Sequence, residues 1–181
     1  MVAPAATHPY QWRVPLAEPP TTMIPRLDAI DWRILKELQA DGRITNVALA
    51  ARVGITPPPC LRRLRALEET GYITGYHAQF DQRLLGFEIT AFVMVGLYSQ
   101  SEADLRAFEN RVLAWPLVRE AHMLSGESDY ALKCVAPDLS SFQDFVTREL
   151  TAAPNVATVK TALSIRQAKH EPGVPLRQGR G

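Results

Sequence analysis

The chain has 181 residues, of which 46% are hydrophobic, and it carries 20 Lys and Arg residues against 19 Asp and Glu residues. This length fits one domain or two small ones and is enough to bury a core. Two cysteines exclude a disulfide framework and a four-cysteine zinc site, and no apolar run approaches the roughly 20 residues that a transmembrane helix needs. The net charge of +1 argues at first against nucleic acid as a partner.

The charge is distributed unevenly along the chain. Residues 26–83 carry nine basic and seven acidic side chains, whereas residues 84–170 carry eight and ten. Between Arg52 and Arg65 there are four arginines and no acidic residue. Because a phosphate backbone responds to the local field, the near-neutral total still allows a basic face that binds nucleic acid.

The two ends of the chain differ in composition from the rest. Residues 1–25 contain six prolines, which predicts an extended, disordered arm. The arm lacks the basic start and apolar run of a secretory signal, so we expect a cytoplasmic protein without a membrane partner. Residues 171–181 are rich in Gly and Pro and predict a flexible tail.

Three helices are predicted within residues 26–80. The first is capped by Asp28, carries apolar residues at helical spacing and ends at Asp41-Gly42. The second is capped by Thr45 and ends at Gly54. The third is capped by Thr56, and Pro57 occupies its first position, where no backbone donor is needed. Its predicted buried stripe consists of Cys60, Leu61, Leu64 and Leu67.

A short hairpin is predicted after the third helix, over residues 72–78, and three helices followed by a hairpin are typical of a winged helix-turn-helix. Ala50 and Gly54 have the spacing that lets the second and third helices pack across a tight turn. In such a domain the third helix enters the major groove of DNA. Its arginines can contact phosphates or guanine edges, and a solvated helix face is the alternative interpretation. The candidate DNA-binding residues are Arg43, Thr45, Arg52, Thr56, Pro58, Arg62, Arg63 and Arg65.

A second domain is predicted over residues 87–170, after a linker at 81–86. Strands are expected at 89–98, 118–124, 130–135 and 155–165. Two helices lie between them, one capped by Ser101 with Leu105, Phe108, Val112 and Leu113 facing inward, and one running from Leu139 to Leu150. The order βαββαβ predicts a ferredoxin-like fold in an α+β protein, with helices on one face of the sheet.

The other face of this sheet has no helix to cover it. The first strand is apolar on both sides, since Phe92, Val93, Met94 and Val95 follow one another. An uncovered apolar face predicts a partner, most simply a second copy of the chain. A homodimer with two DNA-binding domains would contact two half-sites of double-stranded DNA.

Several motifs together resemble the Lrp/AsnC family of transcription regulators over residues 26–170, and most closely its leucine-responsive branch. They include Gly42-Arg43-Ile44, Arg52-Val53-Gly54-Ile55-Thr56, Gly71-Tyr72-Ile73-Thr74-Gly75-Tyr76, and the run from His122 to Tyr130 that contains Ser125-Gly126 and Asp129. The resemblance implies dimers through paired sheets that assemble into rings such as an octamer. It also implies an amino-acid effector, bound between dimers beside residues 125–130.

The chemistry of that turn agrees with an amino-acid effector. Asp129 or Glu127 can offset an ammonium group, and the backbone N–H groups around Gly126 can meet a carboxylate. Glu127-Ser128 replaces the acid-aromatic pair of the leucine-responsive branch, which leaves the effector open. A plain β-turn would have a similar composition. The candidate effector-binding residues are Met123, Leu124, Gly126, Glu127, Ser128, Asp129 and Tyr130.

Other chemistry has weaker support in the sequence. His122 has no second ligand at metal spacing, so a structural role is expected, and Cys60 and Cys134 are expected to be buried and inert. No cofactor and no catalytic group are predicted. The sequence therefore predicts an amino-acid-responsive DNA-binding regulator. An enzyme resembling the sirohaem decarboxylases and an effector-independent DNA organiser on the same two-domain plan are the alternatives.

Overall fold

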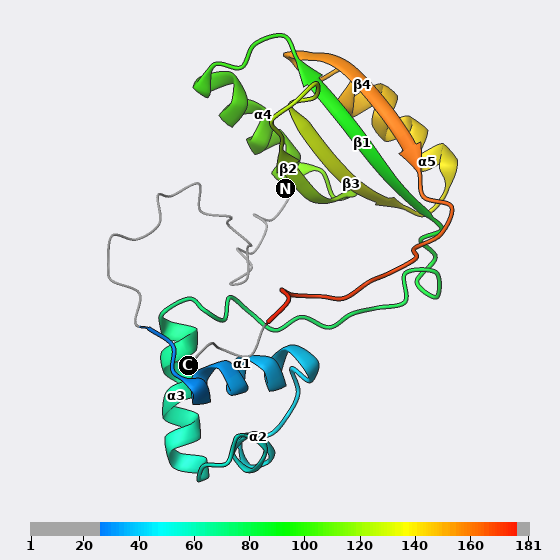
Figure 1. The fold of residues 1–181 in the computed structure, drawn as a ribbon. Helices are drawn as coiled ribbons and strands as arrows, with labels where there is room; N and C mark the ends of the chain where they lie inside the picture. The colour runs from blue at the N-terminus through cyan, green and yellow to red at the C-terminus, as the bar shows by residue number, and fades with distance from the viewer. Residues whose placement is uncertain (1–25, 177–181) are drawn as a thin grey trace, which may run out of the picture. The chain divides into compact units, whose positions relative to one another are not determined.

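The computed structural model describes residues 26–176, which divide into two compact units. The first unit runs to His77 and takes in the chain again from Pro172, and the second spans Ala78–Glu171 (Figure 1). The predicted arm at 1–25 and the last five residues of the predicted tail lie outside the described residues. Within residues 26–176, no helix combines the length and the apolar character that crossing a membrane requires.

The first unit begins with two helices whose predicted caps are confirmed. In α1 (Ala29–Ala40) the Asp28 carboxylate accepts the N–H groups of Ile30 and Asp31, and the Asp31 carboxylate accepts the N–H of Asp28, which completes a capping box. In α2 (Asn46–Val53) the Thr45 hydroxyl accepts the N–H of Ala48 at 3.2 Å. This helix ends at Gly54, whose φ of +76° suits glycine and strains other residues.

The third helix, α3 (Pro57–Glu69), starts after Thr56 as predicted, but the Thr56 side chain makes no capping hydrogen bond. A capping oxygen accepts from the N–H of the second or third helical residue. Here those residues are Pro58 and Pro59, which have no N–H. The predicted side-chain cap is therefore wrong, and the proline ring at each of the first three positions explains why.

The core of the first unit lies between these helices, and one residue of the predicted stripe is missing from it. The buried set is Ile34, Leu49, Ala50, Val53, Cys60 and Leu67, with Leu64 half-buried beside it. Leu61 is half-buried but does not belong to this cluster. At 100° per residue it lies a quarter-turn from Cys60, which places it toward the outer face of α3.

The predicted hairpin over residues 72–78 does not form in this structure. This segment contains no strand. The chain turns away from the end of α3 at Gly71, which has a φ of +79°. Ile73 packs on the helical core, and the Tyr76 hydroxyl donates to Glu68 at 2.9 Å. An isolated two-stranded hairpin is marginal in water, and these two contacts hold the segment against the helices without strand pairing.

The C-terminal segment of the described chain docks on α1. The Gln39 side chain donates to the carbonyl of Val174 at 2.8 Å and accepts the N–H of Val174 at 3.1 Å. Gly173 lies at φ +86°, and a Cβ there would collide with the Gln39 side chain. Glycine at 173 thus permits this close approach of the backbone to the α1 side chain.

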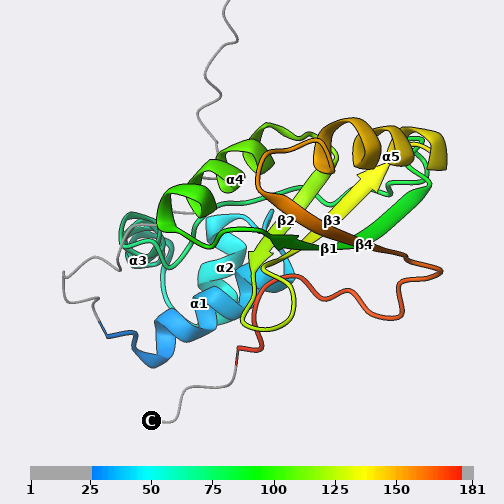
Figure 2. The same cartoon turned by 90° about the horizontal axis from the view of Figure 1, so that it is seen from above.

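The second unit has the predicted βαββαβ order. Its strands are β1 (Ile89–Leu97), β2 (Val118–Met123), β3 (Tyr130–Ala136) and β4 (Val156–Leu163), hydrogen-bonded in the order β2-β3-β1-β4 with antiparallel neighbours. Its helices are α4 (Glu102–Ala114) and α5 (Leu139–Phe145), which continues as the π-helix η1 (Val146–Leu150). Both α4 and α5 cover the same face of the sheet (Figure 2).

The two faces of the sheet differ as the sequence predicts. On β1, Val93 and Val95 are fully buried under the helices, whereas Phe92 and Met94 on the opposite face are 49% and 40% exposed. Across the strands Phe92 pairs with Lys133 and Ala162, and Lys133 forms a 2.6 Å ion pair with Glu120. The open face is thus an apolar stripe beside a charged pair.

One inward-facing prediction for α4 is wrong. Ser101 caps this helix, and Leu105, Phe108 and Val112 are buried, but Leu113 is 74% exposed. It follows Val112 directly, so a rotation of about 100° along the helix carries its side chain away from the sheet.

Candidate functional site

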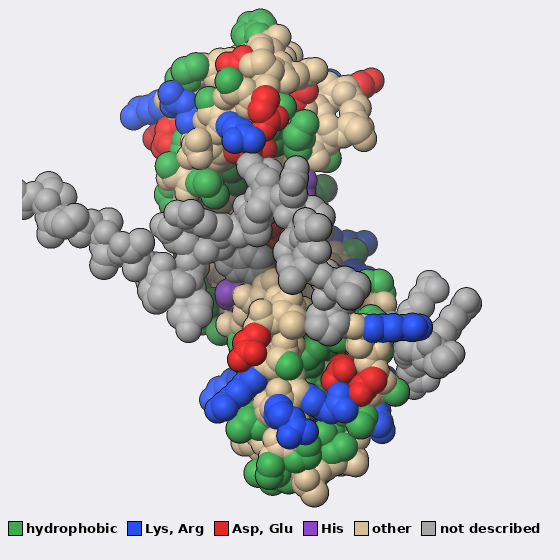
Figure 3. Space-filling view, turned by 90° about the vertical axis from the view of Figure 1, so that its left-hand side faces the viewer, with side chains coloured by type: hydrophobic (Ala, Val, Ile, Leu, Met, Phe, Trp, Pro, Cys, Tyr) green, Lys and Arg blue, Asp and Glu red, His purple; other side chains and the backbone are tan. Residues whose placement is uncertain are grey.

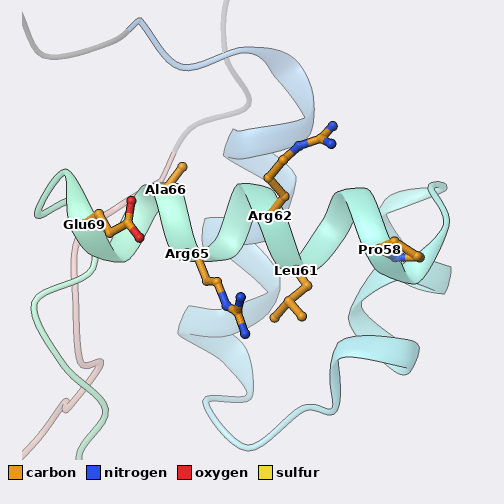
Figure 4. A pocket seen from close by; sticks show the side chains of 6 residues that line it. All are labelled: Pro58, Leu61, Arg62, Arg65, Ala66 and Glu69. Atoms are coloured by element: carbon orange, nitrogen blue, oxygen red, sulfur yellow. The ribbon is translucent and has the colours of Figure 1, made fainter.

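The outer face of α3 is exposed and carries two arginines. Arg62 and Arg65 border an open hollow of about 330 Å³ that is also lined by Pro58, Leu61, Ala66 and Glu69 (Figure 4). Within residues 26–176, neither arginine has a recorded ion pair. The face of the first unit seen in Figure 3 shows basic side chains among hydrophobic and acidic ones. This surface can meet an anionic partner without first breaking internal contacts.

Arg63 behaves differently from its neighbours on α3. Its guanidinium donates to Asp28 at 2.7 Å and to Asp31 at 2.8 Å, so it joins α3 to the start of α1. A backbone hydrogen bond from Asp31 holds the pKa of Asp28 below its ordinary value, and Arg63 adds to this effect. The two carboxylates raise the pKa of Arg63 further. Arg63 therefore links α3 to the start of α1 within the domain.

The remaining candidates for DNA contact lie around α2. Arg52, at the end of this helix, forms a 3.1 Å ion pair with Glu37 of α1, and its side chain is half exposed. Arg43 is exposed, while the Thr45 hydroxyl already accepts a backbone N–H as the cap of α2. Thr56 and Pro58 lie at the start of α3. Seven of the eight candidates thus lie near the ends of α2 or at the start and on the outer face of α3. The eighth, Arg63, binds the start of α1.

Asn46 is a contributor that sequence reasoning missed. Its amide donates to the carbonyl of Pro57 at 2.9 Å, which ties the start of α2 to the start of α3. Its side-chain oxygen is buried without a hydrogen-bond partner. Asparagine directly after a capping threonine looks like an ordinary first helical residue, so only the tertiary structure reveals this contact.

The candidate effector turn connects β2 to β3. It is closed by the N–H of Leu124, which donates to the carbonyl of Asp129 at 2.8 Å. Gly126 and Glu127 are exposed, Leu124 and Ser128 are half-buried, and Met123 is exposed at the end of β2. The backbone around Gly126 and the side chains of Glu127 and Ser128 are therefore accessible to a small polar ligand.

Asp129 anchors this turn to the neighbouring strand and loop. Its carboxylate accepts the N–H of Leu97 at 2.6 Å and the side-chain amide of Gln100 at 2.9 Å, and its own N–H donates to the carbonyl of Val95. Gln100 is a second residue that the sequence analysis missed. Each carboxylate oxygen accepts one donor, so Asp129 positions the turn against β1 and the following loop.

Tyr130 lies in the core rather than on the turn. Its ring packs 4.8 Å from that of Phe108, and its hydroxyl donates to Glu109 at 3.0 Å. Burial raises its pKa well above the ordinary value, and the nearby carboxylate adds to the shift. Tyr130 thus anchors the end of the turn in the core, through Phe108 and Glu109 of α4.

The loop that follows β1 is held from two sides. The Asn155 side chain accepts the N–H of Ser99 at 2.8 Å and donates to its carbonyl at 2.7 Å. Asn155 itself has a φ of +70°, which asparagine tolerates better than most residues. The Ser99 hydroxyl donates to Asp104 on α4. Gln100 is therefore presented to Asp129 from a fixed backbone.

Metal-binding geometry does not occur in the part of the chain that the structure describes, where no three His, Cys, Asp or Glu side chains are grouped for it. Both cysteines are buried as predicted, and burial raises the pKa of the Cys134 thiol to about 11. His122 lies exposed at 3.7 Å from Glu120. Its predicted structural role therefore amounts to a weak surface contact.

Comparison with known proteins agrees with this architecture. Residues 27–74 match a family model described as winged helix-turn-helix DNA-binding, and residues 90–174 match one described as the Lrp/AsnC ligand binding domain. A leucine-responsive regulatory protein of Rhizobium meliloti (strain 1021) is 64% identical over 143 residues, which span 79% of this chain and 92% of the relative. The Bkd operon transcriptional regulator of Pseudomonas aeruginosa is 39% identical over 83% of this chain and 98% of its own length.

Solved structures give the same picture. A transcriptional regulator of Neisseria meningitidis, determined as a complex with L-methionine, superposes with a TM-score of 0.79 at 34% identity, and the match covers 83% of this chain and 97% of that one. A regulator from Agrobacterium tumefaciens superposes with a TM-score of 0.78 at 32% identity and the same coverage.

Proposed function

Because the chain belongs to the Lrp/AsnC family of transcriptional regulators, we propose that it regulates transcription by binding DNA through the outer face of α3 and a small amino acid at the β2–β3 turn. Its relatives are named as transcriptional regulators, several of them as leucine-responsive. A regulator of this kind acts where the chromosome is, so we place its activity in the cytoplasm.

The observation that carries the DNA-binding proposal is the pair of exposed arginines beside the hollow on α3. Arg62 and Arg65 are available for contacts with phosphates or guanine edges. Thr56 and Pro58 lie at the start of α3, the helix that would enter the major groove. We assign Arg43, Thr45 and Arg52 to phosphate contacts that set the position of the domain on DNA. We assign Arg63 to holding α3 against α1.

The effector proposal rests on the accessible backbone of the β2–β3 turn. Ser125, Gly126 and Glu127 are exposed, so their backbone N–H groups suit a carboxylate, and the Glu127 side chain suits an ammonium. Ser128 lines the same turn, and Met123 and Leu124 supply apolar surface for an effector side chain. Asp129 and Tyr130 hold the turn in place. The L-methionine complex of the Neisseria relative supports an amino acid as the class of effector.

We propose that the open face of the sheet pairs with a second copy and that such dimers build larger rings. The apolar stripe with Phe92 and Met94 supports this pairing, since burying it would remove exposed apolar surface from water. Light scattering of the purified chain should then give a mass that is an even multiple of 20.1 kDa. A mass of 20.1 kDa at micromolar concentration would contradict the pairing.

DNA binding and effector response are tested together on the full chain. A labelled duplex from upstream of its own gene should bind at moderate salt, and one of the twenty amino acids should raise the melting temperature and change DNA occupancy. Failure to bind any specific duplex would overturn the proposed function. Purified protein that is coloured by a haem-like pigment would favour the enzyme, and sequence-indifferent coating that no amino acid changes would favour the DNA organiser.

A further inference from the structure

The start of α3 offers almost no backbone hydrogen-bond donors. Pro57, Pro58 and Pro59 occupy its first three positions and have no N–H. The next N–H, that of Cys60, donates to the Thr56 carbonyl at 3.3 Å. The free N–H groups with which a helix start can hold a phosphate are therefore missing here. Apart from the Thr56 hydroxyl, the start of α3 offers a ligand only the apolar rings of its three prolines.

Leu61 continues that apolar surface along the outer face of α3. It follows Pro58 by three residues and precedes Arg65 by four, so all three lie along one side of the helix. Figure 4 shows the Leu61 and Arg65 side chains extending from the same side of α3. Leu61 lines the outer hollow and does not belong to the buried cluster of the domain. A single half-exposed leucine is common on proteins, but this one lies next to Arg62 and one turn from Arg65, neither of which forms an ion pair among the described residues.

The major groove offers one apolar group on its base edges, the C5-methyl of thymine. On the basis of the proposed function, we propose that Pro58 and Leu61 form an apolar contact that recognises a thymine methyl in each half-site, while Arg62 and Arg65 bind the surrounding phosphates or guanine. Charge complementarity supports DNA as the occupant of this surface, since two arginines without an ion pair among the described residues outnumber the single acid, Glu69, in its lining. Leu61 is then a specificity-determining residue.

The size of the effect follows from the transfer of one methyl group out of water. Burying a methyl against Leu61 should strengthen binding about fourfold at each thymine. For a dimer that contacts two half-sites, the two contributions multiply to about fifteenfold. Deoxyuridine has the same base pairing as thymidine and lacks only the methyl, so it isolates this contribution.

The experiment uses a random-sequence duplex pool enriched on the full-length wild-type chain. The selected duplex is then prepared twice, with thymidine and with deoxyuridine, and Kd is measured by fluorescence anisotropy at one salt concentration. We expect an invariant thymine in each half-site and wild-type binding that is about fourfold to fifteenfold weaker on the deoxyuridine duplex. For Leu61→Ala we expect a clearly smaller ratio between the two Kd values, because the methyl keeps Pro58 but loses the larger of its two apolar partners.

Arg65→Ala is the matched control. It should weaken binding to both duplexes and keep the wild-type ratio between them, since it removes a charge and leaves the apolar contact. Equal wild-type Kd values on the two duplexes, or an undiminished ratio in Leu61→Ala with an unchanged melting temperature, would overturn the inference and leave DNA binding itself established. If the wild-type chain enriched no sequence from the duplex pool, the proposed function and this inference would both be wrong.

Discussion

Asp129→Ala is expected to lower the free energy of unfolding of the second unit by about 2–3 kcal/mol and to abolish the response to an amino-acid effector. The substitution removes the acceptor for two donors, the N–H of Leu97 at 2.6 Å and the side-chain amide of Gln100 at 2.9 Å. Hydrogen bonds to a charged group are the strong ones, and the Leu97 N–H would be left without its partner. The turn would then lose the contacts that hold it against β1 and the following loop.

Two measurements separate these effects. Calorimetric unfolding reports the stability loss, and hydrogen exchange at the amide of Leu97 reports the loss of its partner directly. Thermal shift with the effector identified for the wild type then tests ligand binding. Glu127→Ala is the matched control for stability, because this exposed side chain of the same turn has no recorded hydrogen bond within residues 26–176. Wild-type exchange at Leu97 in Asp129→Ala would show that this anchor is unimportant.

Arg63→Ala is expected to lower the stability of the first unit by about 1–2 kcal/mol while leaving the salt dependence of DNA binding unchanged. The guanidinium holds Asp28 and Asp31 at 2.7 and 2.8 Å, and the Asp31 side chain is only 16% exposed. Because Asp28 also caps α1, the substitution leaves two neighbouring carboxylates without their shared cation. Part of this loss is screened by solvent, since Asp28 is half exposed.

Arg65→Ala should show the opposite pattern, and it is the matched control on the same helix. The Arg65 side chain forms no ion pair among the described residues, so the melting temperature of the Arg65→Ala variant should match that of the wild type. The slope of log K against log salt should fall by about 1, because one phosphate contact is lost. If Arg63→Ala instead lowered this slope at unchanged stability, Arg63 would be a DNA contact and the structural assignment would be wrong.

The Arg63 cluster also sets a pH dependence in acid. The folded state holds the pKa of Asp28 below its ordinary value of 3.8. A carboxyl with a lowered pKa contributes stability that is present above its unfolded pKa and is lost as the pH falls through the folded value. Unfolding curves of the wild type should therefore lose stability below about pH 4. In Arg63→Ala this loss should be smaller, because one of the interactions that lower the pKa of Asp28 is absent.

Local sequence determined most of the secondary structure. Asp28, Thr45 and Ser101 cap their helices as predicted, because a capping side chain bonds to N–H groups two or three residues further along the chain. The alternation of Phe92, Val93, Met94 and Val95 similarly predicted two apolar faces on β1. The prediction of a side-chain cap by Thr56 was wrong for an equally local reason. Pro58 and Pro59, which lack the N–H groups that such a cap needs, are visible in the sequence.

The tertiary structure decided which charged and polar side chains remain available for binding. Arg63 has the same local environment in the sequence as Arg62 and Arg65, and only the packing of α3 against α1 brings it to carboxylates 32 and 35 residues away. Asp129 likewise has the composition of a ligand-binding turn, yet its partner Leu97 lies 32 residues earlier. Helix and strand periodicity fixes the side of an element on which a residue lies, whereas ion pairs between elements depend on distances that no local pattern encodes.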